Sequence, residues 1–122
     1  LQLLFNDEDK ILTLLTPNKN TLVLDDKNSQ IELKDQNGNS LVMNSSGITL
    51  KSDKDITLQA AQNITIKGDA GITIESSGGD CAVKATNVNV AANMALSAKG
   101  NTQASIQGGT KLSLNATMIM IN

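Results

Sequence analysis

Acidic and amide side chains that could bind a metal ion gather in one short segment, Asp35-Gln36-Asn37-Gly38-Asn39. Calcium loops of the EF-hand type use such oxygen ligands, with a glycine at the sixth position and a bidentate glutamate at the twelfth. Counted from Asp35, the glycine stands at the fourth position and Ser46 at the twelfth. The spacing therefore predicts a turn rather than a calcium site.

Catalytic chemistry and zinc binding lack their usual side chains in this sequence. The chain has no histidine and one cysteine, Cys81. No histidine base can activate a serine or a thiol, and no ordinary zinc site can form within one chain. Gly78-Gly79-Asp80 is similar to a calcium-binding nonapeptide repeat, but it occurs once and the surrounding period is eight residues. These features predict a protein that is not an enzyme and that holds no cofactor and no metal.

The elements that must position all of these residues repeat every eight residues. Apolar–Thr–apolar triplets stand in register at Ile48-Thr49-Leu50, Ile56-Thr57-Leu58, Ile64-Thr65-Ile66 and Ile72-Thr73-Ile74. Looser copies follow at Val88-Asn89-Val90, Leu96-Ser97-Ala98, Ala104-Ser105-Ile106 and Leu112-Ser113-Leu114. Because side chains alternate along a strand, the outer two residues of each triplet share one face. A short strand and a tight turn in every octad predict a solenoid.

One fault interrupts this octad frame. At Asp80-Cys81-Ala82 the strict frame turns Asp80 inward. A shift of one residue places Cys81 and Val83 inward instead. Burial of a small thiol costs little, whereas an unpaired buried carboxylate costs several kcal/mol, so we expect the shifted frame.

The first part of the chain shows a looser version of the same unit. Short apolar strands are predicted at residues 11–14, 22–24, 31–33 and 41–43, and their starts lie nine to eleven residues apart. We interpret residues 1–47 as lead-in strands with longer loops at the start of a β-helix, and residues 48–122 as a regular octad-repeat needle. No window has the apolar spacing of an amphipathic helix.

Composition narrows the class of protein further. The net charge is −2, so the chain is not a strongly basic nucleic-acid binder. Residues 1–80 carry all twelve acidic residues, whereas residues 81–122 carry three lysines and no acid. Phe5 is the only aromatic residue, so a globular core of bulky side chains is not expected. No apolar run approaches the ~18 residues of a membrane span.

The octad period allows two architectures. Three octads could form one coil of a single-chain β-helix, or three chains could wind around one axis. Nothing in the sequence resembles the polar cap that a single-chain solenoid needs, and two aliphatic residues per strand are a meagre core for one chain. We therefore expect an all-β, intertwined trimeric (triple-stranded) β-helix or β-prism. The expected core and trimerisation residues are Ile48, Leu50, Ile56, Leu58, Ile64, Ile66, Ile72, Ile74, Val88, Val90, Leu112 and Leu114.

The run GITLKSDKDITLQAAQNITIKGDAGITIESSGG, residues 47–79, resembles the C-terminal needle of VgrG-type spike proteins of type VI secretion systems. These are similar to the cell-puncturing spike of contractile phage tails. The resemblance covers about residues 10–122. Phage spikes of the family favour a Val-x-Gly octad, whereas this chain favours Ile-Thr-Ile or Ile-Thr-Leu, so it looks closer to the secretion-system branch.

The resemblance implies a structural role. It implies a homotrimer that pierces a target membrane with its C-terminal end leading, below N-terminal spike modules of the same polypeptide. It also implies a PAAR-type tip protein at the C-terminal end and no nucleic-acid partner. The needle would be assembled in the bacterial cytoplasm and then expelled to the extracellular space or the target cell, or would belong to a phage-like tail particle.

The C-terminal residues suggest where a tip protein would bind. Met118, Ile119, Met120, Ile121 and Asn122 end the sequence in an apolar strand, and exposed apolar edges are normally covered. They form either a platform for a separate tip protein or simply a last, frayed strand.

Two other functions fit parts of the pattern. A receptor-binding fibre or an adhesin stalk would share the rod, but it predicts an aromatic-rich tip that this sequence lacks. An ice-binding single-chain solenoid would use the column Thr49, Thr57, Thr65 and Thr73. Such surfaces carry paired threonine ranks, whereas each threonine here is flanked by aliphatic residues.

Overall fold

The computed structural model describes residues 1–122 and divides them into two compact units, Leu1–Gly71 and Ile72–Asn122. The structure is all-β and contains no helix, as predicted. The first unit holds a six-stranded sheet followed by extended chain, and the second unit consists of extended chain with regular bends.

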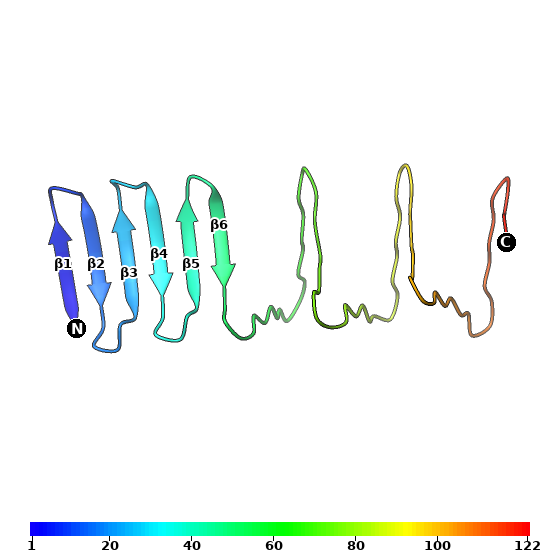
Figure 1. The fold of residues 1–122 in the computed structure, drawn as a ribbon, viewed down its shortest axis with the longest axis horizontal. Helices are drawn as coiled ribbons and strands as arrows, with labels where there is room; N and C mark the ends of the chain where they lie inside the picture. Colours follow the sequence, from blue (N-terminus) through cyan, green and yellow to red (C-terminus); the bar gives the residue numbers. More distant parts are fainter. The chain divides into compact units, whose positions relative to one another are not determined.

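The sheet is an antiparallel meander in which every strand is hydrogen-bonded to the next strand in the sequence (Figure 1). Its strands are β1 (Gln2–Asn6), β2 (Ile11–Leu15), β3 (Thr21–Asp25), β4 (Gln30–Lys34), β5 (Ser40–Asn44) and β6 (Gly47–Lys51). The four strands predicted between residues 11 and 43 are confirmed as parts of β2 to β5. β1 was not predicted, and β6 takes the first octad triplet into the sheet.

Turn chemistry keeps these strands in register. Turns at residues 7–10 and 26–29 lie at one end of the strands, and turns at residues 16–20 and 35–39 lie at the other end. At the first end, the last residue of the strand caps the turn that follows. Asn6 Oδ1 accepts the Asp9 N–H at 3.1 Å, and Asp25 Oδ1 accepts the Asn28 N–H at 2.9 Å. At the other end Thr16 Oγ1 caps its turn in the same manner, by accepting the Asn20 N–H at 3.1 Å. These side-chain caps pre-form each turn, so successive strands return at matching heights.

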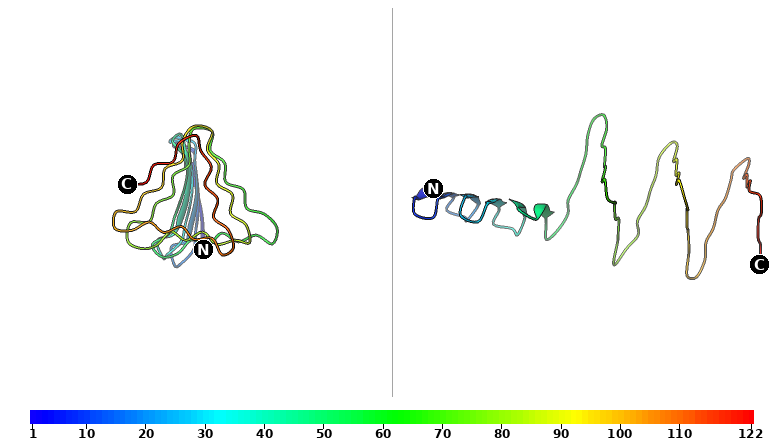
Figure 2. Two further views of the ribbon diagram at one scale, coloured as in Figure 1. Left: turned by 90° about the vertical axis from the view of Figure 1, so that its right-hand side faces the viewer. Right: turned by 90° about the horizontal axis from the view of Figure 1, so that it is seen from above.

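From residue 52 onward the chain is extended and bends at a regular interval. Bends lie at residues 53–54, 61–62, 69–70, 77–79, 86, 93–94, 101–102, 109–110 and 117. The bends delimit segments that begin, with small adjustments, every eight residues, which confirms the octad as a structural unit. Within residues 72–122 the successive windings follow a three-cornered path when viewed end on (Figure 2).

The single chain has no buried core. No residue of any type is buried, and most aliphatic side chains of the sheet and of the octads are exposed. The structure therefore presents its apolar residues on surfaces, and those surfaces are the candidate functional sites.

Candidate assembly surface

One face of the six-stranded sheet is entirely apolar. Directly opposite residues on paired strands share a face, so the strand register assigns every side chain. Leu14, for example, lies opposite Leu3 on β1 and Leu22 on β3. Followed across all five pairings, the register places two apolar residues from every strand on this face: Leu3, Phe5, Leu12, Leu14, Leu22, Leu24, Ile31, Leu33, Leu41, Met43, Ile48 and Leu50.

The opposite face of the sheet is mixed and largely polar. Its central positions include Thr13, Glu32 and Thr49, and the ends of its strands carry residues such as Lys34 and Asp25. Glu32 and Lys34 lie two residues apart on β4 and form an ion pair with an N–O distance of 3.1 Å. An antiparallel sheet with one apolar and one polar face normally packs its apolar face against another layer.

No residue of this chain covers the apolar face. Leu14 is 40% exposed, Leu33 53% and Phe5 71%. Twelve adjacent apolar side chains form a larger exposed patch than a soluble single chain normally presents. The face is therefore an interface that the single chain leaves open.

The octads continue the same arrangement without a sheet of their own. In each six-residue segment between bends, the second and fourth residues are the apolar pair. In most octads the second residue is the less exposed one: 52–55% of the residue is exposed at Ile56, Ile64, Ile72, Val88, Leu112 and Ile119, whereas Leu96 is an exception at 67%. The fourth residue is more open, as in Ile66 at 66% and Ile74 at 75%. A similar side-chain environment thus recurs in most octads.

The bends also resolve the fault near Cys81. The bend at residues 77–79 is one residue longer than its neighbours, and the bend at residue 86 is one residue shorter. Cys81 and Val83 consequently take the second and fourth positions of their segment, as the shifted frame predicted. Asp80 takes the first position, which is polar or small in most octads.

The extended segments lack backbone partners within the chain. All backbone ladders lie between β1 and β6, and no backbone-to-backbone hydrogen bond involves a residue beyond Lys51. Extended backbone carries one donor and one acceptor on each residue, and these groups pair in a stable buried structure. Residues 52–122 therefore present extended backbone whose donors and acceptors have no partner within the chain.

The predicted core residues, and two of the five predicted tip residues, take the apolar positions of the sheet and the octads. Ile48 and Leu50 lie on the apolar face of β6, and the other ten predicted core residues take second and fourth positions of octads. In the last segment Ile119 and Ile121 occupy these positions, while Met118 and Met120 occupy the first and third. Met118 is 74% and Met120 75% exposed. Their role in trimerisation and tip binding stays a prediction.

Sequence reasoning missed the contribution of the first strands. Ten of the twelve residues on the apolar face precede Ile48, and none of them was among the predicted core residues. The signal was present, because each pair has the same apolar–x–apolar spacing as the octads. Leu3 and Phe5 of β1 show this spacing immediately before a turn rich in acidic residues.

The segment considered as a calcium loop is a turn. Asp35 Oδ1 accepts the backbone N–H groups of Asn37 at 2.8 Å and Asn39 at 2.9 Å, and its Oδ2 accepts their side-chain amides at 3.1 and 2.8 Å. These bonds, the Asn39 N–H above all, lower the pKa of Asp35 from 3.8 to about 2. The carboxylate is thus occupied by N–H donors, which favour its charged form.

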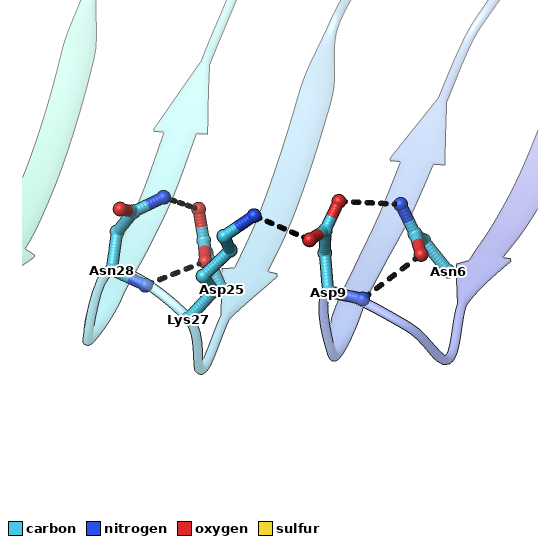
Figure 3. A network of polar contacts seen from close by, with 5 residues as sticks. All are labelled: Asn6, Asp9, Asp25, Lys27 and Asn28. Atoms are coloured by element: carbon cyan, nitrogen blue, oxygen red, sulfur yellow. Dashed lines mark hydrogen bonds and ion pairs between the residues drawn. The ribbon is translucent and has the colours of Figure 1, made fainter.

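A second polar network joins the turns at residues 7–10 and 26–29, at the opposite end of the strands (Figure 3). The Lys27 ammonium donates to Asp9, and Asp9 also accepts the side-chain amide of Asn6 at 3.2 Å. The side-chain amide of Asn28 donates to Asp25 at 2.9 Å and is the main cause of the lowered pKa of Asp25. This network stabilises the two turns.

No three side chains of the types His, Cys, Asp and Glu come together as metal ligands. Cys81 is free and exposed. The chain contains no helix of the length and apolarity that a bilayer crossing requires. What the arrangement can do is associate with strands and apolar faces of other chains.

Comparison with known families supports this conclusion. Residues 11–54 match the family described as phage baseplate V C-terminal trimerisation domain. The matched segment comprises β2 to β6 and the first bend, so it contains most of the apolar face. No curated protein matches the chain. The match supports a structural domain like the C-terminal part of a phage-tail spike, and it supports association into a homotrimer.

Proposed function

We propose that this chain is the needle of a membrane-piercing spike in a contractile injection machine, formed by three copies. The observation that carries the proposal is the exposed apolar pair that recurs on every strand of the sheet matched by the trimerisation domain and in every octad. Repeated apolar pairs on a chain without a buried core are consistent with three copies that share one interior.

In the first part of the needle, three sheets enclose a triangular prism. Each copy supplies one wall, with its twelve apolar side chains toward the axis and the face of Thr13 and Glu32 toward solvent. Every wall keeps its backbone ladder within one chain. Association there depends on burial of apolar area, which contributes roughly 25 cal/mol for each Å² removed from water.

In the second part, the walls are shared between chains. One winding takes three octads, or 24 residues, because each octad crosses one wall and then bends. With a strand spacing of ~4.8 Å, neighbouring strands of one chain on a wall lie about 14 Å apart when two strands of other chains fill the gap. On the wall that β6 begins, the next strands are then residues 55–60 of one neighbour and residues 63–68 of the other. This filling satisfies the backbone groups that one chain leaves open.

The function of such a rod is mechanical. Pulling one chain out of the shared walls breaks many interchain hydrogen bonds together, so the needle resists bending and unfolding while it is driven through a membrane. Its sequence resemblance favours a type VI secretion spike of the VgrG type. N-terminal spike modules of the same polypeptide would hold the needle, and a PAAR-type tip protein would bind Met118–Asn122. The needle would assemble in the bacterial cytoplasm and leave the cell when the machine contracts.

The proposal is tested in cells that produce the machine. Ile64→Asp places three carboxylates near the axis, whereas Thr65→Asp places them on the outer surface of the same segment. We expect Ile64→Asp to abolish delivery into target cells and Thr65→Asp to preserve it, when both proteins are expressed equally. Normal delivery by the Ile64→Asp variant would contradict the proposal.

A further inference from the structure

The octads by themselves do not specify how three chains align. All of them offer an apolar pair at the second and fourth positions, so a slip of one octad keeps apolar residues inside and polar residues outside. Register is weakly specified wherever a shifted pairing preserves the buried face. Some non-repetitive part of the chain must therefore define which octad comes first.

The end of the sheet contains such a part. Ser52, the first residue after β6, donates its hydroxyl to Asn39 Oδ1 at 2.6 Å and accepts the Lys54 N–H at 3.1 Å. Asn39 is itself held by Asp35, through its backbone N–H at 2.9 Å and its side-chain amide at 2.8 Å. The chain that leaves the sheet is thus tied to the turn between β4 and β5 at the point where the first bend begins.

Gly38 makes this close approach possible. Its φ of +91° lies in the region that favours glycine, and a Cβ on its backbone would stand 2.2 Å from Asp53 Oδ2 and 3.0 Å from Asp53 Cγ. Any other residue at position 38 therefore has to adopt a strained backbone conformation and displace the Asp53 side chain from the turn. We call the five residues Asp35, Gly38, Asn39, Ser52 and Asp53 the junction.

The junction is anchored on the sheet and lies beside the first octad. Gln36, in the same turn, donates its backbone N–H to Asn20 Oδ1 at 3.0 Å, which ties this turn to the turn between β2 and β3. A hollow of about 470 Å³ beside the junction is lined by Leu41 and Leu50 of the sheet and by Ile56 of the first octad. The apolar face and Ile56 of the first octad therefore meet here.

We propose that the junction sets the interchain register of the needle, by fixing residues 55–60 as the first octad that crosses to the neighbouring wall. This inference rests on the proposed trimer. In it, the partner that fits the free edge of β6 is the first octad of a second copy. When the junction is intact, the second octad cannot take that place, because the first octad would have to loop out and break the Ser52 hydrogen bonds.

Interchain disulfides between outward positions report the register directly. Thr49 is the central residue of β6 on the polar face, and Thr57 and Thr65 are the central outward residues of the first and second octads. In the aligned needle Thr49 lies beside Thr57 of a neighbour, one strand away, and about 10 Å from Thr65 of the other neighbour. Disulfides require Cα atoms about 4.4–6.8 Å apart, so only the first pair can form.

The experiment uses the whole chain with Cys81→Ser, and compares Thr49→Cys/Thr57→Cys with Thr49→Cys/Thr65→Cys after mild oxidation. We expect covalent trimers from the first pair and none from the second. When Ser52→Ala or Gly38→Ala is added, we expect a loss of trimers from the first pair and a gain from the second. Ser46→Ala is the matched control, because the Ser46 hydroxyl makes no hydrogen bond and the turn uses only its N–H.

The outcomes separate this inference from the proposed trimer. If both junction variants cross-link as the parent does, the junction does not set the register and the inference is overturned, while the trimer stands. If the parent gives no covalent trimer with either pair, the proposed trimer fails and the inference fails with it. Ser52→Ala removes only a hydroxyl, and alanine can adopt the backbone conformation of Ser52. This variant therefore tests whether the junction sets the register even if Gly38→Ala does not fold.

Discussion

Replacement of Leu14 by aspartate tests whether the apolar face of the sheet is the interior of a trimer. Leu14 is 40% exposed in the single chain, between Leu3 and Leu22. Covering that remaining surface contributes about 1 kcal/mol for each copy. An unpaired carboxylate in the same position costs several kcal/mol more for each ion. For three copies the total is on the order of 10 kcal/mol, which weakens association by about seven orders of magnitude.

The matched control for this substitution is the neighbouring residue of β2. Thr13→Asp introduces the same charge into the same strand, but on the polar face opposite Leu4 and Val23. Both variants carry a similar loss of strand propensity, of at most ~1 kcal/mol. Light scattering coupled to size exclusion should find a trimer for Thr13→Asp and a monomer for Leu14→Asp at neutral pH. A trimer from Leu14→Asp, or an equal loss of trimer in both variants, would refute the assignment of this face to the interior of the trimer.

Three further predictions concern the octads and the turns. In the trimer, amide hydrogens of residues 55–60, 63–68 and 71–76 should exchange as slowly as those of β3, because interchain ladders protect them; rapid exchange in a species of trimeric mass would contradict the shared walls. The pKa of Asp35 is lowered to about 2 in the folded chain, so its contribution to stability is present above pH 3.8 and is lost as the pH falls through 2. Asp35→Asn should remove this acid dependence, as followed by circular dichroism between pH 5 and pH 1.5. An unchanged acid transition would contradict a stabilising role of the Asp35 carboxylate in its turn. Lys27→Ala should lower the free energy of unfolding by no more than ~1 kcal/mol, because the Lys27 side chain is 59% exposed, and a larger loss in chemical denaturation would show that the turn network of Figure 3 matters more than its exposure suggests.

The sequence was sufficient to locate most strands and bends. Alternation of apolar residues, as in Leu22-Val23-Leu24, is visible in any strand with one covered face, and the repeated triplets indicate the octad directly. The shifted frame at Cys81 followed from the cost of burying Asp80. These inferences depend only on the types and spacing of residues that are close in the sequence.

The pairing of the first six strands could not be predicted in the same way. Residues 1–47 were interpreted as lead-in strands at the start of a β-helix, and that interpretation did not include the antiparallel pairing of each strand with the next one in the chain. Which strands pair depends on the conformation of the turns between them. Two of these turns contain a lysine with a positive φ, Lys10 at 57° and Lys19 at 64°, and a lysine in the sequence does not indicate such a conformation. The contact between Gly38 and Asp53 was equally hidden, because it joins a turn to a bend fifteen residues later.

The mass of the chain in solution tests the central claim most directly. Light scattering coupled to size exclusion should give about three times 12.8 kDa, with elution earlier than a globular protein of that mass, since the proposed trimer is elongated. A compact monomer of 12.8 kDa would contradict the claim, because one chain would then have to cover its own apolar face and satisfy the backbone of its own octads.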